Sequence, residues 1–81
     1  MSTKDYLYKL ADIEHLALIH KREKQWKEAE KKFLQVIEIR KRVYGIDYLN
    51  TLNSIANLVL TYIDQGDLST VKLEIIKDLV Y

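Results

Sequence analysis

Apolar residues recur at intervals of three and four along most of the chain, which is the spacing of helices that bury one face. This pattern predicts a first helix over residues 6–22 and a second over residues 26–44. On a helical wheel the apolar positions of the second helix fill an arc of about 120°. Gly45 follows directly, at the place where a left-handed residue commonly ends a helix.

Two further helices are predicted in the second half of the chain. The apolar stripe of the third runs from residue 52 to residue 63, with Asn50 or Thr51 as its N-terminal cap. Residues 64–67 form a predicted turn, and Asp67 or Ser69 caps a fourth helix over the remaining residues. Four helices joined by short turns indicate an all-α fold made of two antiparallel helical hairpins.

Composition narrows the class of protein further. The chain has 81 residues, no cysteine, no proline and two glycines. We therefore expect one small domain over residues 1–81, without disulfides, thiolate nucleophiles or cysteine-bound zinc. The first residues lack an apolar secretory core, and no apolar run approaches the roughly 20 residues that cross a bilayer. These observations predict an intracellular, cytoplasmic protein that does not enter a membrane.

An internal repeat of 42 residues is the most informative signal in the chain. Apolar or aromatic character is kept at the paired positions Ile13 and Ile55, Leu16 and Leu58, Leu18 and Leu60, His20 and Tyr62, Trp26 and Leu68, Phe33 and Ile75, Leu34 and Ile76, and Ile37 and Leu79. One hairpin is too thin to bury its own apolar face, so the repetition predicts two stacked units. Repeat one spans about residues 10–45, and repeat two, which is incomplete, spans about residues 50–81.

Repeat one also carries a distinctive motif. A Leu-Ala pair, a Trp-Lys-Glu-Ala-Glu run and a basic run before glycine occur in this order: Leu16-Ala17-x-x-His20, residues 25–30, Phe33 and residues 37–45. This motif resembles the tetratricopeptide repeat, and in particular the 42-residue variety of kinesin light chains and fungal NLR-type proteins. The resemblance implies a short, right-handed helical solenoid that acts as a protein–protein interaction module and scaffold.

Repeat two departs from the family pattern at the crossing of its two helices. Val59 and Val71 stand where the family has small residues. Extra methyl groups at a close helix crossing cost about 1–3 kcal/mol unless the helices shift apart. We therefore expect the second hairpin to pack less tightly than the first.

The resemblance also implies a concave groove lined by the first helix of each repeat, which binds a peptide segment of a partner protein. Carried onto this chain, the groove residues are Glu14, His15, Leu18, Arg22, Asn53, Asn57, Leu60 and Asp64. Asn57 keeps the asparagine that hydrogen-bonds an extended backbone in kinesin light chain-like repeats. Glu14 and Leu18 replace the lysine and asparagine that clamp a terminal carboxylate in chaperone-binding relatives, so such a ligand is disfavoured.

The fourth predicted helix has a wide apolar surface. Leu73, Ile76 and Val80 form a row beside a second apolar stripe, whereas the last helix of a finished array needs a polar outer face. Either this surface meets further repeats of a parent protein, or the chain assembles with itself. We expect homo-oligomerisation, most simply a two-fold dimer, and keep a self-associating scaffold without a peptide ligand as an alternative.

Catalytic and nucleic-acid functions receive little support from the sequence. His15 and His20 are five residues apart and point to different sides of one helix, so they cannot share a metal. No catalytic or cofactor-binding motif is present, and we expect neither enzymatic activity nor a cofactor or metal. Residues 21–42 carry a net charge of +5, which leaves a basic nucleic-acid binder as a further alternative. Acidic residues alternate with these lysines, however, as on an ordinary exposed helix.

Overall fold

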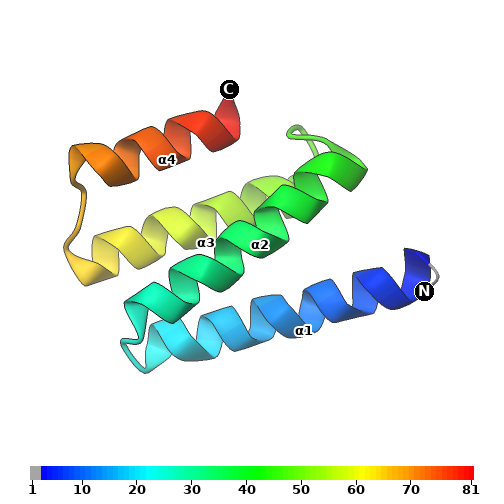
Figure 1. The fold of residues 1–81 in the computed structure, drawn as a ribbon, viewed down its shortest axis with the longest axis horizontal. Coiled ribbons are helices and arrows are strands. Elements are labelled where there is room, and N and C mark those ends of the chain that lie inside the picture. The colour runs from blue at the N-terminus through cyan, green and yellow to red at the C-terminus, as the bar shows by residue number, and fades with distance from the viewer. Residues whose placement is uncertain (1–2) are drawn as a thin grey trace.

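The computed structural model describes residues 3–81, with side chains from residue 9 onward, as four helices joined by short turns (Figure 1). The helices are α1 (Thr3–Arg22), α2 (Trp26–Tyr44), α3 (Leu49–Gln65) and α4 (Thr70–Val80). Successive helices run in opposite directions, so α1 pairs with α2 and α3 with α4 (Figure 1). The predicted all-α fold of two helical hairpins is confirmed.

The connection between the two hairpins begins as the sequence predicts and ends two or three residues earlier than predicted. Gly45, with a φ angle of 92°, follows the last residue of α2. The rings of Tyr44 and Tyr48 then stack with their centroids 4.6 Å apart. Tyr48 has extended backbone angles and directly precedes α3, so the prediction of Asn50 or Thr51 as the cap is wrong. The Thr51 side chain is fully buried within the first turn of α3 and does not cap its end.

The connection inside the second hairpin spans residues 66–69. Gly66 ends α3 in the left-handed region (φ 77°), and its N–H donates to the Ile63 carbonyl at 3.0 Å. Ser69 precedes α4, as predicted, but its hydroxyl makes no capping hydrogen bond. Its backbone N–H donates instead to Asp67 Oδ1 at 3.2 Å, and the Ser69 hydroxyl, followed by this N–H, lowers the pKa of the Asp67 carboxyl.

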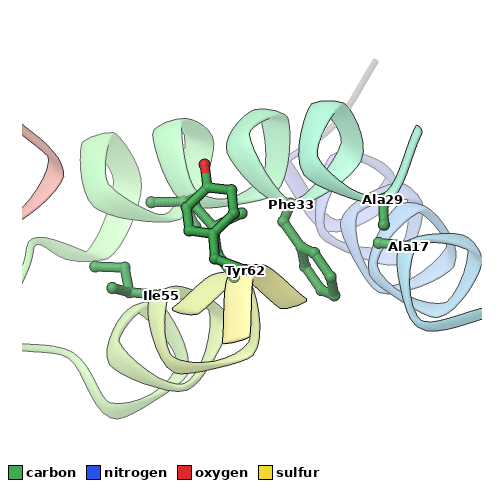
Figure 2. Close-up of a cluster of buried hydrophobic side chains, with 7 residues drawn as sticks. Ala17, Ala29, Phe33, Ile55 and Tyr62 are labelled. Atoms are coloured by element: carbon green, nitrogen blue, oxygen red, sulfur yellow. The ribbon is translucent and has the colours of Figure 1, made fainter. Parts of the chain in front are cut away.

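The hydrophobic core is built from the first three helices (Figure 2). Its buried members come from α1, α2 and α3: Ala17, Ala29, Phe33, Ile37, Ile55, Leu58 and Tyr62. We call these residues the core cluster. Most occupy the positions that the three-and-four pattern predicts, and Tyr62 is fully buried where its repeat-one counterpart His20 is half-buried.

The two hairpins are packed to different extents. Ala29 on α2 is fully buried, whereas its repeat-two counterpart Val71 on α4 is 67% exposed. None of the eleven residues of α4 is buried. The second hairpin is therefore packed more loosely than the first, as expected, and Val71 lies mostly in solvent rather than in a close crossing like that of Ala17 and Ala29.

Candidate functional site

The predicted groove residues lie in two rows, one on α1 and one on α3. His15 and Arg22 on α1 are exposed, and Leu18 is half-buried. The row on α3 consists of Asn53, Asn57, Leu60 and Asp64, of which only Asn57 is half-buried. The two rows come together at the C-terminal ends of the helices, where Lys21 Nζ lies 3.5 Å from Asp64 Oδ2.

A cleft of about 560 Å³ opens at this meeting point. Its walls are formed by residues of α1, of the turn after it, of the start of α2 and of the end of α3: Leu18, Lys21, Arg22, Lys24, Trp26 and Asp64. We call it the basic cleft. The structure thus brings three predicted groove residues into one site, namely Leu18, Arg22 and Asp64.

The turn between α1 and α2 shapes one wall of the basic cleft. Lys24 has a φ angle of 61°, which is in the left-handed region that residues other than glycine rarely adopt. Two backbone hydrogen bonds close the turn around it, from the Lys24 N–H to the Lys21 carbonyl and from the Gln25 N–H to the His20 carbonyl. This turn brings Lys24 and Trp26 into the lining of one cleft.

The electrostatic character of the basic cleft follows from its ion pairing. Lys21 is paired with Asp64, whereas Arg22 and Lys24 are exposed and lie within 4 Å of no acidic side chain that the structure describes. The half-buried side chains of Leu18 and Trp26 supply an apolar wall beside these charges. Such a site attracts a carboxylate that is followed or preceded by an apolar group.

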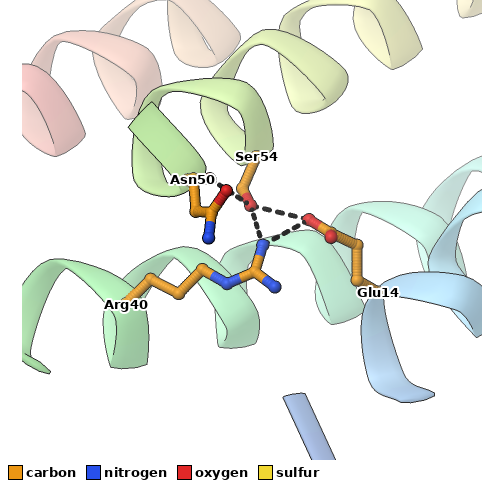
Figure 3. A network of polar contacts seen from close by, with 4 residues as sticks. All are labelled: Glu14, Arg40, Asn50 and Ser54. Atoms are coloured by element: carbon orange, nitrogen blue, oxygen red, sulfur yellow. Dashed lines mark hydrogen bonds and ion pairs between the residues drawn. The ribbon is translucent and has the colours of Figure 1, made fainter. Parts of the chain in front are cut away.

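Glu14 is held in an intramolecular network away from the basic cleft (Figure 3). Arg40 Nη1 on α2 donates to Glu14 Oε2 at 2.8 Å and to Ser54 Oγ at 2.7 Å. Ser54 Oγ is also 2.7 Å from Glu14 Oε2, to which it donates, and 3.0 Å from the carbonyl oxygen of Asn50. Glu14 therefore joins α1 to α2 and α3, and its carboxylate is already occupied.

The remaining groove positions lie outside the basic cleft. His15, Asn53 and Leu60 are exposed, and Leu60 retains 47% of its accessible surface. The backbone carbonyl of Asn57 accepts a hydrogen bond of 2.8 Å from Thr61 Oγ1. Asn53, Asn57 and Leu60 form a polar and apolar strip along α3 that leads toward Asp64, whereas His15 lies on α1.

The three residues predicted for self-association, Leu73, Ile76 and Val80, do not all lie on the same side of α4. Leu73 and Val80 on α4 are 52% and 41% exposed. Ile76 is partly buried and packs against the core cluster together with Leu79. Only the two outer members of the row are therefore on the free side of α4.

Several residues of these two sites are not among the groove residues that the sequence predicts. Lys24 and Trp26 join the groove residues in the basic cleft, and Arg40 and Ser54 hold Glu14. The sequence does hold a signal for the network around Glu14. Arg40 lies at helical spacing from Phe33 and Ile37, and a charge on an apolar stripe needs a partner of opposite charge. The left-handed turn at Lys24 has no comparable signal.

Three further features of the described residues bear on function. In this part of the chain, no three His, Cys, Asp or Glu side chains gather as a group able to hold a metal ion. His20 Nδ1 is hydrogen-bonded to Gln25 Oε1 beside the turn after α1. Within the described residues, no helix has the length and apolar character needed to cross a membrane.

A comparison with the profiles of known protein families shows to which family the chain belongs. The tetratricopeptide repeat profile matches residues 9–70, which include the basic cleft, most of α1, all of α2 and α3, and only the first residue of α4. The chain belongs to the tetratricopeptide repeat family. Comparison with curated proteins and with solved structures finds no match.

Membership of the tetratricopeptide repeat family has a general functional consequence. The repeat is a protein–protein interaction module and is typically non-catalytic, and no enzyme family matches the chain. Protein partners are accordingly implied. The narrower resemblance to kinesin light chains and fungal NLR-type proteins receives no support from the comparisons.

Proposed function

We propose that this tetratricopeptide repeat protein is a non-catalytic scaffold that binds an extended segment of a partner protein along α1 and α3. The basic cleft is the observation that carries the proposal. It unites Leu18, Arg22 and Asp64 from the two predicted rows. The strip on α3, with Asn57 and Leu60, extends the contact surface beyond the cleft.

The chemistry of the basic cleft defines the partner. Arg22 and Lys24 offer hydrogen-bond donors with positive charge to an acidic side chain. Leu18 and Trp26 offer apolar surface to a neighbouring side chain of the same peptide. The partner segment is therefore acidic, with an apolar residue next to the acidic one, and it needs no free C-terminus.

Nucleic acid fits the same surface less well. Three basic residues elsewhere in the described chain are paired with acidic ones, Lys32 with Glu28, Arg40 with Glu14 and Lys72 with Glu30. A nucleic-acid backbone needs a continuous track of available cations. Two unpaired charges beside Asp64 match one or two carboxylates better than a chain of phosphates.

Selection from a random dodecapeptide library on the immobilised protein tests the proposal. We expect the selected peptides to be enriched in Asp and Glu next to an apolar residue. Trp26 is the only tryptophan, so its fluorescence reports occupation of the basic cleft directly. Arg22→Glu should weaken binding of a selected peptide at least about tenfold, since the charge that recognises the carboxylate is reversed.

The exposed Lys31→Glu variant on α2 is the matched control, because Lys31 does not line the basic cleft and the change in net charge is the same. Equal weakening by both variants would show non-specific attraction between a basic protein segment and an acidic peptide. Failure to select any peptide that changes Trp26 fluorescence would contradict the proposed function.

Self-association is a second candidate function, favoured by the exposure of Leu73 and Val80 on α4. Val71, on the same helix, is also 67% exposed. Val71 is two residues from Leu73 and so lies on another side of α4, whereas Leu73 and Val80, seven residues apart, share the side that a second copy of the chain could cover in a homodimer. Sedimentation over a dilution series tests this candidate, since a dimer dissociates as the concentration falls.

A further inference from the structure

The contacts that hold α4 are few and concentrated on one side of the helix. Ile76 and Leu79 pack against the core cluster, and Lys72 reaches back to α2 and α3. Lys72 Nζ lies 2.5 Å from Glu30 Oε2 and 5.2 Å from the centre of the Tyr62 ring. We call the surface that these three α4 residues cover the α4 seat.

Open space separates α4 from α2 at both ends of the α4 seat. A cleft of about 500 Å³ is lined by residues from the C-terminal parts of both helices: Glu38, Lys41, Arg42, Asp78 and Leu79. A smaller cleft of about 200 Å³ lies at the other end: Trp26, Lys27, Glu30, Gln65 and Lys72. With no residue of α4 buried, the helix rests on a narrow line of contact between these clefts.

The ion pair between Lys72 and Glu30 gives the α4 seat its specificity. The two side chains are only 19% and 20% exposed, so water screens their attraction incompletely. They occupy equivalent positions 42 residues apart, one in the second helix of each repeat. A helix that enters the seat must therefore present a positive charge to Glu30.

The segment that joins α3 to α4 can act as a hinge. Three of its four residues, Gly66, Leu68 and Ser69, are exposed. Gly66 holds a left-handed conformation and can leave it without the steric cost that other residues carry. Reorientation of α4 therefore requires backbone changes only in residues 66–69.

We propose that α4 is an exchangeable helix, which leaves its own α4 seat and is replaced there by the α4 of a second copy of the chain. The occupant is a second copy because its α4 makes the same contacts, including the Lys72 to Glu30 ion pair, that the chain's own helix makes. Undocking alone would leave Glu30 without its partner, and reciprocal exchange restores both ion pairs. The inference rests on self-association, the second candidate function above, but it needs no contact through Leu73 and Val80, which stay on the free side of α4 after exchange.

A mixture of two charge-reversed variants tests the exchange. In each of the two single variants, Glu30→Lys or Lys72→Glu, like charges meet whenever α4 occupies the α4 seat of its own chain. In an exchanged heterodimer of the two variants, the introduced lysine meets the introduced glutamate, and Glu30 of one chain meets Lys72 of the other. Opposite charges then meet in both seats, so native mass spectrometry should show about a tenfold excess of heterodimer over either homodimer.

Controls make the result specific. The double variant Glu30→Lys, Lys72→Glu restores attraction within one chain and should assemble like the unmodified protein. If dimers form without preference for the mixed pair, and Leu73→Lys abolishes them, the copies associate face to face and the exchange proposal is wrong. If neither the unmodified protein nor the mixture forms dimers, self-association and exchange are both wrong.

Hydrogen exchange of the unmodified protein gives an independent readout that does not depend on folding of a variant. Exchange requires α4 to open separately, so its backbone amides should be protected at least about tenfold less than those of α2 and α3. Equal protection of α4 and α3 in dilute solution would overturn the proposal.

Discussion

Ala17 of α1 faces Ala29 of α2 where the two helices of the first hairpin cross, and neither residue is exposed to solvent (Figure 2). Their counterparts in the second hairpin are Val59, which is half-buried, and Val71, which is mostly exposed. The two equivalent positions are therefore both alanine in the closely packed first hairpin and both valine in the more loosely packed second hairpin. Two small side chains let the first crossing close tightly, whereas Val71 lies mostly in solvent and makes no such contact in the second hairpin.

Substitution at equivalent positions of the two repeats tests this explanation. Ala29→Val should lower the free energy of unfolding by about 1–3 kcal/mol, because the closed crossing has no room for two more methyl groups. The reverse change Val71→Ala removes an exposed side chain and should alter it by less than about 0.5 kcal/mol. Urea denaturation followed by circular dichroism measures both values. Equal effects would show that crossing volume does not separate the hairpins.

The network around Glu14 should contribute more to stability than an exposed ion pair. Arg40→Ala leaves the partly buried Glu14 carboxylate without its main partner, and we expect a loss of about 1.5–3 kcal/mol. Lys32→Ala breaks the more exposed contact with Glu28 and should cost less than about 1 kcal/mol. A double-mutant cycle on Glu14 and Arg40 measures their coupling, and a coupling near zero would contradict a structural role.

The buried hydroxyl of Tyr62 predicts a dependence of stability on alkaline pH. Among the described residues this hydroxyl has no hydrogen-bond partner. Burial, followed by the proximity of the Glu30 carboxylate, raises the pKa of Tyr62 above its usual value. The folded protein then keeps the proton that the unfolded chain loses above about pH 10, so stability is unaffected below that pH and falls above it.

Tyr62→Phe separates this effect from the titration of other residues. The variant should be as stable as the unmodified protein at pH 7, since no hydrogen bond is lost. By pH 11 the unmodified protein should have lost about 1.4 kcal/mol more than the variant. Urea midpoints measured between pH 8 and pH 11 provide the comparison. Parallel curves for the two proteins would mean that Tyr62 ionises normally.

Leu73 and Ile76 should respond differently to the same substitution. Leu73→Lys changes an exposed side chain and should leave the free energy of unfolding within about 0.5 kcal/mol of its original value. Ile76→Lys places a charge against the core cluster and should cost about 1–3 kcal/mol, first by undocking α4. Thermal unfolding in dilute solution distinguishes them, and similar midpoints would place both residues on the free side of the helix.

Local sequence patterns predict the helices well but not all of their ends. The three-and-four spacing locates four helices. Gly45 marks the end of α2, because glycine adopts a positive φ angle without the steric cost that other residues carry. The cap of α3 was mispredicted because Thr51 is suited both to a helix end and to a buried turn. Its burial in the folded chain decides between them.

The candidate site could be predicted only in part. Their places in the repeat predict Leu18, Arg22 and Asp64 as groove residues, and these three line the basic cleft. Glu14 is predicted in the same way, yet its carboxylate is paired with Arg40. A position in a repeat indicates which side of a helix a residue occupies, and it does not indicate which side chain from another helix arrives there.

The sequence by itself determined the all-α class, the two hairpins and the 42-residue register, because helical periodicity and repetition are properties of residue order. Tertiary structure alone decided that Arg22, Lys24 and Trp26 share one cleft, and that Lys72 pairs with Glu30. These contacts depend on how closely helices cross, and that distance is set by the packed volumes of side chains distant in sequence.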